Sequence, residues 1–200
     1  FFDIRLEPYL LAPAARHDDV APALRALVAQ TQQNARALVH GDVSPKNILV
    51  PLDKPEPEPG GGLRPRPPVL LDAECAWWGD PAFDLAFCLN HLLLKCLWQP
   101  VARDDFLACF AELAAAYLAG VDWEGRAAIE QRAAALLPGL FLARIDGKSP
   151  VEYVQAEDDR ALVRRVAKSL LRQPPQALAE VSGAWGQALG ERGPDTPRAH

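Results

Sequence analysis

A short segment of the chain has the residue types of a phosphoryl-transfer site. It reads His40-Gly41-Asp42, reaches Asn47 five positions after the aspartate, and continues into the apolar run Ile48-Leu49-Val50. A second apolar run further along the chain ends in Asp72. Transfer of a phosphoryl group to an alcohol needs a carboxylate to receive the hydroxyl proton, and an amide and a second carboxylate to hold magnesium on a nucleotide. The sequence therefore predicts Asp42 as the base and Asn47 and Asp72 as magnesium ligands.

Each of these three residues also has a plainer interpretation. Gly-Asp pairs are common in turns, so Asp42 taken alone would be a turn or capping residue. Asn47 taken alone would be a loop residue that hydrogen-bonds its own backbone, and Asp72 a turn at the end of a strand. It is the joint presence of the blocks that favours the catalytic interpretation.

Two short strands are expected to position the site. Apolar runs at 48–52 and 69–72 predict a hairpin. The joining residues 53–68 are rich in proline, glycine and charge, which is typical of a flexible loop. Residues 1–11 are mixed in character and end in an aromatic-rich turn, and 191–200 are expected to form a disordered tail.

Helices account for most of the remaining chain. Asp80 and Pro81 predict the cap and first turn of a helix that is apolar nearly all round, which is typical of a buried central helix. Apolar periodicity and the positions of glycine and proline predict helices over 20–38, 82–98, 103–119, 123–143, 156–171 and 175–190. The expected fold class is therefore α+β and mostly helical, with a small β-hairpin that carries the catalytic loop.

The composition indicates one globular domain and bounds the partners. The chain has 200 residues, half of them hydrophobic, and residues 1–190 suffice for one core. A net charge of −5 argues against nucleic acid or an anionic membrane as the main partner. No apolar run is long enough to span a bilayer. The four cysteines are expected to be reduced core thiols of a cytoplasmic protein, and no pair of them has metal-binding spacing: Cys75, Cys88, Cys96 and Cys109.

The order of the motifs resembles a known superfamily. His40-Gly41-Asp42 with Asn47, then Asp72-Ala73-Glu74, then the Gly79–Ala86 block (GDPAFDLA) are similar to the aminoglycoside phosphotransferase and choline kinase-like small-molecule kinases. The form Asp72-x-Glu74 is similar to methylthioribose kinases within that group. The resemblance is close over about residues 35–98 and only general beyond. It implies the C-terminal lobe of a protein-kinase-like fold, with ATP as co-substrate, Mg²⁺ as cofactor and a small hydroxyl compound as acceptor.

Further residues around the motifs have expected roles. By resemblance, His40 packs beneath the loop and Asp84 binds loop backbone groups, since a charge amid apolar neighbours needs partners when buried. Glu74 shares a face with Asp72 and either binds a second metal or faces solvent. Lys46 and Ser44 flank the base and are candidate phosphate contacts, although an exposed lysine is the plainer interpretation.

A polar segment between two later helices is a candidate for the acceptor pocket. It contains Arg144, Asp146 and Lys148, and a structural turn explains it equally well. Its Gly-Lys-Ser sequence is not a P-loop, because Leu142 stands where that motif needs a glycine. Acidic residues of the later helices would suit a cationic acceptor, although a solvated helix face explains them better: Glu112, Asp122, Glu124, Glu157, Asp158 and Asp159.

The resemblance also implies a nucleotide-binding N-terminal lobe, for which this chain has no room before His40. The chain contains no methionine and begins Phe1-Phe2, which indicates a piece of something longer. By itself the chain is therefore expected to bind nucleotide weakly and to have little activity.

Three functions compete at this point. The first is an ATP-dependent kinase of a small alcohol; the second is a kinase-like binding or regulatory module, or an inactive fragment. The intact set of Asp42, Asn47 and Asp72 favours the enzyme. A metal-dependent phosphohydrolase is a weaker third, because it would need several histidines near these residues. The sequence does not identify the acceptor.

Overall fold

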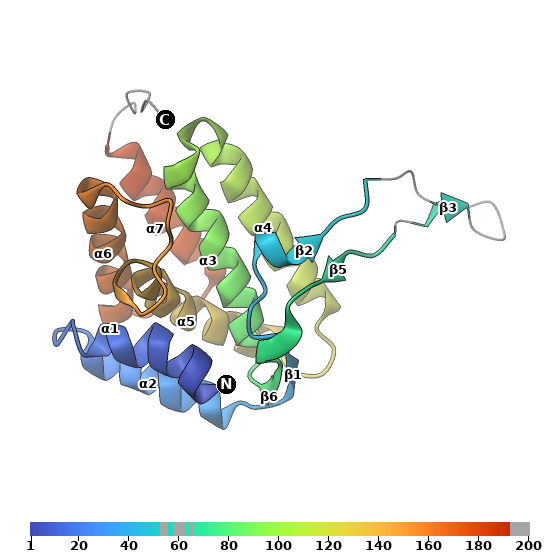
Figure 1. Ribbon diagram of the computed structural model, residues 1–200, viewed down its shortest axis with the longest axis horizontal. Helices are drawn as coiled ribbons and strands as arrows, with labels where there is room; N and C mark the ends of the chain where they lie inside the picture. The colour runs from blue at the N-terminus through green and yellow to red at the C-terminus, as the bar shows by residue number, and fades with distance from the viewer. Residues whose placement is uncertain (53–55, 58–62, 65, 193–200) are drawn as a thin grey trace.

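The chain folds into a helical body from which a small hairpin projects (Figure 1). The computed structural model describes residues 1–52, 56–57, 63–64 and 66–192. In this part the helices are η1 (Phe2–Leu11), α1 (Ala12–Ala14), α2 (Ala21–Gln33), η2 (Pro45–Asn47), η3 (Ala73–Cys75), α3 (Ala82–Trp98), η4 (Pro100–Ala102), α4 (Arg103–Gly120), α5 (Arg126–Asp146), α6 (Glu157–Arg172) and α7 (Leu178–Gly190). The expectation of a mostly helical chain with a little antiparallel sheet is thereby confirmed.

The strands form three antiparallel pairs. β1 (Ala37–Val39) pairs with β6 (Trp77–Gly79), and β2 (Ile48–Leu49) pairs with β5 (Val69–Leu70). The third pair joins β3 (Glu56–Pro57) and β4 (Leu63–Arg64). The hairpin predicted from the two apolar runs is therefore present as β2–β5, although its strands are shorter than 48–52 and 69–72.

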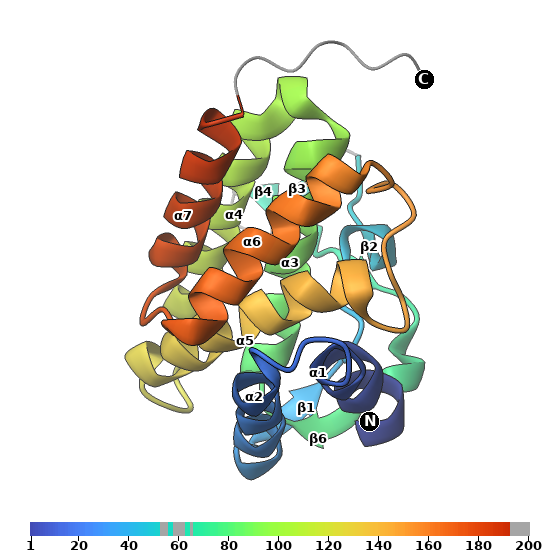
Figure 2. The same ribbon diagram turned by 90° about the vertical axis from the view of Figure 1, so that its left-hand side faces the viewer.

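Helix α3 lies at the centre of the body, packed against α4 and α5. Its bounds are those predicted from the sequence, and Phe83, Leu89, Leu93 and Leu94 on it are fully buried. Figure 2 shows α5 crossing between α3 and the α1–α2 pair, with α6 and α7 on the outer side. Because α3 is apolar on most faces, it can be covered from several directions at once.

Gly139 of α5 lets the N-terminal segment approach this core closely. A Cβ there would lie 2.9 Å from Leu10 Cδ2 and 3.0 Å from Leu27 Cδ1. A larger side chain would push η1 and α2 away from α5. The position therefore ties the first helices of the chain to the body that carries the site.

Two local expectations were wrong. Residues 1–11 form the helix η1 rather than a mixed segment with a turn, and the helix expected over 20–38 ends at Gln33, after which Ala37–Val39 become a strand. The two elements concerned, η1 and β1, depend on partners elsewhere in the chain. Helix η1 packs on α2 and α5, and β1 forms through its pairing with β6. The remaining helices differ from expectation by a few residues at their ends.

Parts of two predictions lie outside the described residues. Of the predicted flexible loop 53–68, positions 53–55, 58–62 and 65 are not described, and the short β3–β4 pair within it was not predicted. Of the predicted tail 191–200, only 191–192 are described, as a turn in which Arg192 pairs with Asp159.

All four cysteines are free thiols, but only three belong to the interior. Cys75, Cys88 and Cys96 are buried, whereas Cys109 is exposed, which corrects its expected place in the core. Burial raises the pKa of the Cys88 and Cys96 thiols to about 11. Among the described residues, no helix combines the length and apolarity that a membrane crossing requires.

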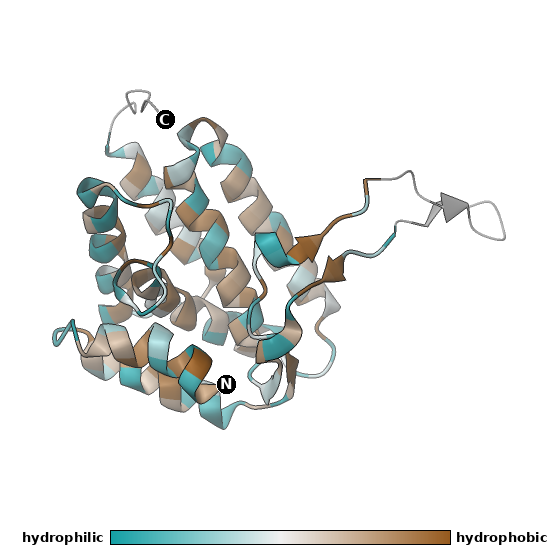
Figure 3. Cartoon of the chain, viewed as in Figure 1, coloured by the Kyte–Doolittle hydropathy of each residue, from teal (hydrophilic) through white to brown (hydrophobic). Residues whose placement is uncertain are grey.

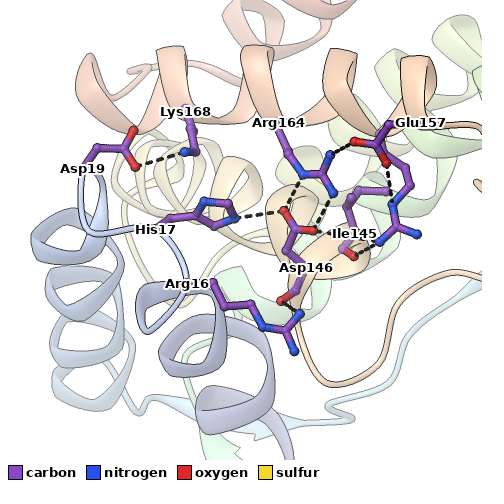
Figure 4. Close-up of polar contacts among 9 residues, drawn as sticks. Arg16, His17, Asp19, Ile145, Asp146, Glu157, Arg164 and Lys168 are labelled. Carbon is purple, nitrogen blue, oxygen red and sulfur yellow. Dashed lines mark hydrogen bonds and ion pairs between the residues drawn. The ribbon is translucent and has the colours of Figure 1, made fainter.

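A buried carboxylate at the end of α5 joins three segments (Figure 4). Asp146 Oδ2 lies 2.9 Å from His17 Nε2 and 2.7 Å from Arg164 Nε, and its Oδ1 accepts from Arg164 at 2.9 Å. Arg16 donates to the Asp146 carbonyl at 2.8 Å. Burial would raise the pKa of Asp146, but the hydrogen bonds from Arg164 and His17 outweigh it and lower the pKa.

Asp146→Asn is expected to reduce the free energy of unfolding by about 2 kcal/mol near pH 7, because the variant loses charge-assisted hydrogen bonds. Since the pKa of Asp146 is lower in the folded state, its contribution is full above the unfolded value, about 3.9, and fades as the pH falls through the folded value. Urea denaturation at several pH values measures the difference. The exposed Asp158→Asn is the matched control, and equal losses in both variants would contradict the assignment.

Candidate functional site

The 40–47 loop is fixed to the core by a single carboxylate of α3. Asp84 Oδ2 accepts the His40 N–H at 2.6 Å, and Oδ1 accepts the Gly41 N–H at 2.8 Å. This is the contact that the resemblance implied for Asp84, and it supplies the partners that a carboxylate in apolar surroundings needs. Burial raises the pKa of the Asp84 carboxyl above its usual value, and the two loop N–H groups oppose that shift.

His40 uses one ring nitrogen to join the loop to the hairpin and the other to bond within the loop. Its Nε2 donates to the Leu71 carbonyl at 2.9 Å, and its Nδ1 accepts the Asp42 N–H at 3.2 Å. These partners require a neutral imidazole that carries its proton on Nε2. The ring therefore sets both the turn at Asp42 and the distance between the loop and the end of β5.

Asp42 is held from two sides. Asn47 Nδ2 donates to Asp42 Oδ2 and to its carbonyl, both at 3.0 Å. On the other side, Arg5 of η1 lies 3.3 Å from Asp42 Oδ1 and also donates to the Gly41 carbonyl. The Asp42 side chain keeps 15 % of its surface exposed. Its carboxylate is thus fixed in direction yet still open to a small group.

Arg5 is the residue that sequence reasoning missed. Its guanidinium carbon lies 5.7 Å from the centre of the Tyr9 ring and 5.8 Å from that of Phe87, so the aromatic faces hold it in place. No motif marks it, because it precedes Asp42 by more than thirty positions and its segment was not expected to be helical. Only a helical reading of residues 1–11, which puts Arg5 and Tyr9 on one face, would have suggested it.

The β2–β5 pairing brings Asp72 to the same end of the hairpin as Asn47. Ile48 is opposite Leu70, and the Leu71 N–H donates to the Asn47 carbonyl at 2.8 Å, so Asp72 follows the last paired residue. Asp72 has φ 64°, in the left-handed region that aspartate tolerates better than most residues. Its side chain is exposed, with no hydrogen bond or ion pair to other described residues.

The donors of this end of the hairpin fit a magnesium ion on a nucleotide. The Asn47 NH₂ group is occupied by Asp42, which leaves its amide oxygen without a partner among the described residues. Asn47 and Asp72 therefore offer one amide oxygen and one free carboxylate. Mg²⁺ is usually held by one or two protein oxygens together with phosphates and water. The described residues contain no group of three His, Cys, Asp or Glu side chains that converge as a metal cage.

The other expected site residues lie at different depths. Glu74 and Lys46 are exposed near the hairpin end and the loop. Ser44, by contrast, is 1 % exposed, and its hydroxyl has no hydrogen-bond partner in the described structure. A phosphate could reach the exposed Lys46 directly, but contact with the buried Ser44 would need the loop to open.

The 144–149 segment is divided between two environments. Arg144 donates to Tyr9 Oη at 3.0 Å and to the Ser149 carbonyl at 2.6 Å, so it lies beside the ring that holds Arg5. Lys148 pairs with Glu7 at 2.7 Å. Asp146 is turned to the ion-pair network with His17 and Arg164 described above. Of the three candidate acceptor contacts, only Arg144 lies beside Tyr9, the ring that packs on Arg5.

The Gly79–Ala86 block has a structural as well as a positioning part. Asp80 Oδ1 accepts the Ala82 N–H at 3.0 Å, which confirms the expected cap of the central helix. The same buried carboxylate pairs with Arg132 of α5 at 3.0 Å. This fixes the start of α3, and with it the position at which Asp84 meets the loop.

No protein-family model and no curated protein matches the chain.

Gly41→Ala is expected to lower the free energy of unfolding by roughly 1–3 kcal/mol. Gly41 has φ +78°, and a Cβ there would lie 2.7 Å from the Cys75 carbonyl oxygen, so both the backbone and the space exclude a side chain. Thermal and urea denaturation measure the loss.

Gly120→Ala is the matched control. Gly120 ends α4 with nothing within 4 Å of an added Cβ, and the change should leave stability equal or slightly higher. If Gly41→Ala were as mild as Gly120→Ala, the 40–47 loop would not be as tightly constrained as its contacts indicate.

Proposed function

We propose that the chain is the catalytic lobe of an ATP-dependent phosphotransferase that moves the γ-phosphoryl group of ATP to a hydroxyl of a small molecule. The observation that carries the proposal is the joint placement of Asp42, Asn47 and Asp72. The 40–47 loop and the hairpin end lie side by side, and the base, the free amide oxygen and the free carboxylate come from these two elements. The resemblance of the motifs to small-molecule kinases of protein-kinase-like fold supports the same function.

In the proposed reaction the acceptor hydroxyl lies against the Asp42 carboxylate. Its oxygen attacks the γ-phosphorus, the bond from that phosphorus to the bridging oxygen of ADP breaks, and the hydroxyl proton passes to Asp42. Asn47 and Asp72 would hold Mg²⁺, which neutralises charge on the phosphates when it is bound. The hydrogen bond from Asn47 to Asp42 couples the metal ligand to the base, so the two keep a fixed separation.

The hairpin offers a surface beside the metal ligands on which a nucleotide base can lie. Its apolar side chains are unusually exposed, with Leu49 at 53 %, Val69 at 53 % and Leu70 at 50 %. Figure 3 shows the same apolar character at β2 and β5. Apolar surface of this kind is rarely left uncovered without a role in binding. It therefore favours a nucleotide at this end of the loop.

A binding or regulatory module without catalysis is the alternative. The buried support of the loop by Asp84 and Arg5 would serve such a module as well. What favours the enzyme is that Asp72 and the Asn47 oxygen have no structural partner among the described residues. A scaffold has no need of donors left free at a common edge.

Asp42→Asn and Asp72→Asn are each expected to reduce turnover by about 10²-fold or more, because one removes the proton acceptor and the other a metal ligand. The measurement is ADP release with a panel of small alcohols. It uses the chain together with any residues that its gene encodes before Phe1. Asp158→Asn, on an exposed helix face, should keep full activity. Wild-type rates in both site variants, with unchanged thermal stability, would favour the binding module.

Arg5→Met is expected to lower kcat by about tenfold to a hundredfold with little change in the KM for ATP, because Asp42 loses the group that fixes its direction. Arg5→Lys keeps a cation near Asp42 but cannot make the second bond to Gly41, so it should restore part of kcat. Steady-state kinetics with circular dichroism as a fold check separates this from unfolding. An unchanged kcat in Arg5→Met would remove Arg5 from the site.

A further inference from the structure

Three cations gather beside the 40–47 loop without a carboxylate to neutralise them. They are Lys46 of the loop, Lys95 of α3 and Arg144 of α5, and we call them the cationic cluster. Among the described residues none of the three forms an ion pair with an acidic side chain. Arg144 donates to Tyr9 and Ser149, and Lys95 lies 4.4 Å from the centre of the Trp98 ring.

The cluster surrounds a histidine whose ring has no hydrogen-bond partner. His91 of α3 is 8 % exposed, and neither ring nitrogen bonds to another described residue. Burial, together with the charges of Arg144, Lys95 and Lys46, lowers the pKa of His91 to about 3, so the ring stays neutral. A neutral imidazole presents one donor and one acceptor. Both ring nitrogens are therefore available to a polar group of a ligand.

Aromatic contacts connect the cluster to the base without a break. Arg5, which pairs with Asp42, and Arg144 each lie 5.7 Å from the centre of the Tyr9 ring. Tyr9 packs 5.3 Å from Phe87, and Phe87 packs 5.4 Å from His91. The aromatic contacts therefore run from Arg5, beside Asp42, along α3 to His91.

The connection between α5 and α6 packs against the end of α3. Tyr153 packs 5.6 Å from Trp98, and Lys95 lies 5.7 Å from the Tyr153 ring centre. The Tyr153 hydroxyl and the Arg144 Nε are buried with no hydrogen-bond partner in the described structure. Figure 1 shows α3 between this connection on one side and the 40–47 loop on the other. Cations, unsatisfied polar atoms and aromatic faces thus meet over one helix.

We propose that the cationic cluster binds the acceptor, and that the acceptor is an alcohol with a carboxylate or phosphate group rather than a cationic or uncharged one. In this arrangement the anionic group lies against Arg144 and Lys95, His91 bonds a neutral polar group, and the hydroxyl reaches Asp42. The inference rests on the proposed function for the identity of the reacting group, but not for the charge of the ligand.

Three of the six acidic residues considered from the sequence as partners of a cationic acceptor are engaged elsewhere. Glu124 pairs with Arg132, Glu157 pairs with Arg164, and Asp159 pairs with Arg192. None of these three carboxylates pairs with a cation of the cluster. The charges that act on His91 are all positive, in a chain whose net charge is −5.

The test measures binding and turnover separately. D-Glycerate and glycerol 3-phosphate serve as anionic alcohols, glycerol as the uncharged match and choline as the cationic one. Binding to the chain without nucleotide is followed by isothermal titration and by the His91 ring resonances in NMR. Both anionic probes should bind at least tenfold more tightly than glycerol and choline and should shift His91.

Charge removal gives the second arm. Lys95→Gln and Arg144→Met should each weaken anion binding about tenfold or more, and Lys46→Gln, whose side chain is exposed and has no structural contact to lose, repeats the test where folding is not at risk. Arg165→Met is the matched control, since Arg165 is 59 % exposed on α6, and it should bind as the wild type does.

The outcomes separate the two proposals. Preference for glycerol or choline, binding of neither anionic probe, or equal affinity in the three variants and the control overturns the anionic acceptor. ADP release with an uncharged or cationic alcohol would overturn it as well while leaving the phosphotransferase in place. Anion binding at the cluster with no ADP release under any acceptor, in the protein with its upstream sequence, supports the site and counts against the phosphotransferase.

Discussion

The two hydrogen bonds from the 40–47 loop to Asp84 are the constraint on which the site depends. A carboxylate buried in the core is strongly destabilising unless donors satisfy it, and here the donors are backbone N–H groups of His40 and Gly41. Hydrogen bonds to a charged group contribute about 1.5–3 kcal/mol each. Because the donors belong to the backbone, only a substitution by proline removes an N–H itself. Once α3 packs, these two bonds fix the start of the loop that carries Asp42.

The supports of Asp42 come from segments far apart in the sequence and act in different directions. Asp84 of α3 accepts hydrogen bonds from the loop, His40 donates to the residue that follows β5, and Arg5 of η1 pairs with Asp42 itself. A carboxylate held in this way needs little rearrangement when a hydroxyl meets it, which is the main contribution a protein can make to a loose phosphoryl transfer. The arrangement also explains why η1 belongs to the site although it carries no motif.

Local patterns in the sequence were sufficient for the central helix and the hairpin, but not for β1, β6 or η1. The limits of α3 followed from Asp80, Pro81 and an apolar run, each a short-range signal. The strand Ala37–Val39 forms because Trp77–Gly79 pairs with it, and propensity at three residues cannot predict that. Likewise, Asp84 could be predicted to need partners because of its apolar neighbours, whereas Arg5 could not, since its contacts exist only after η1 has packed on α3.

The charge of the site could not be derived from the charge of the chain. Acidic residues of the later helices would have suited a cationic acceptor, although a solvated helix face explained them better, and several of these carboxylates are neutralised by arginines on α5 and α6 or after α7. Lys46, Lys95 and Arg144 act together on His91 without such partners. Electrostatic selection of a small ligand depends on the charges that remain uncompensated within a few ångströms, because exposed charges beyond about 10 Å are screened. Around His91, the local charges rather than the net charge of the chain favour an anion.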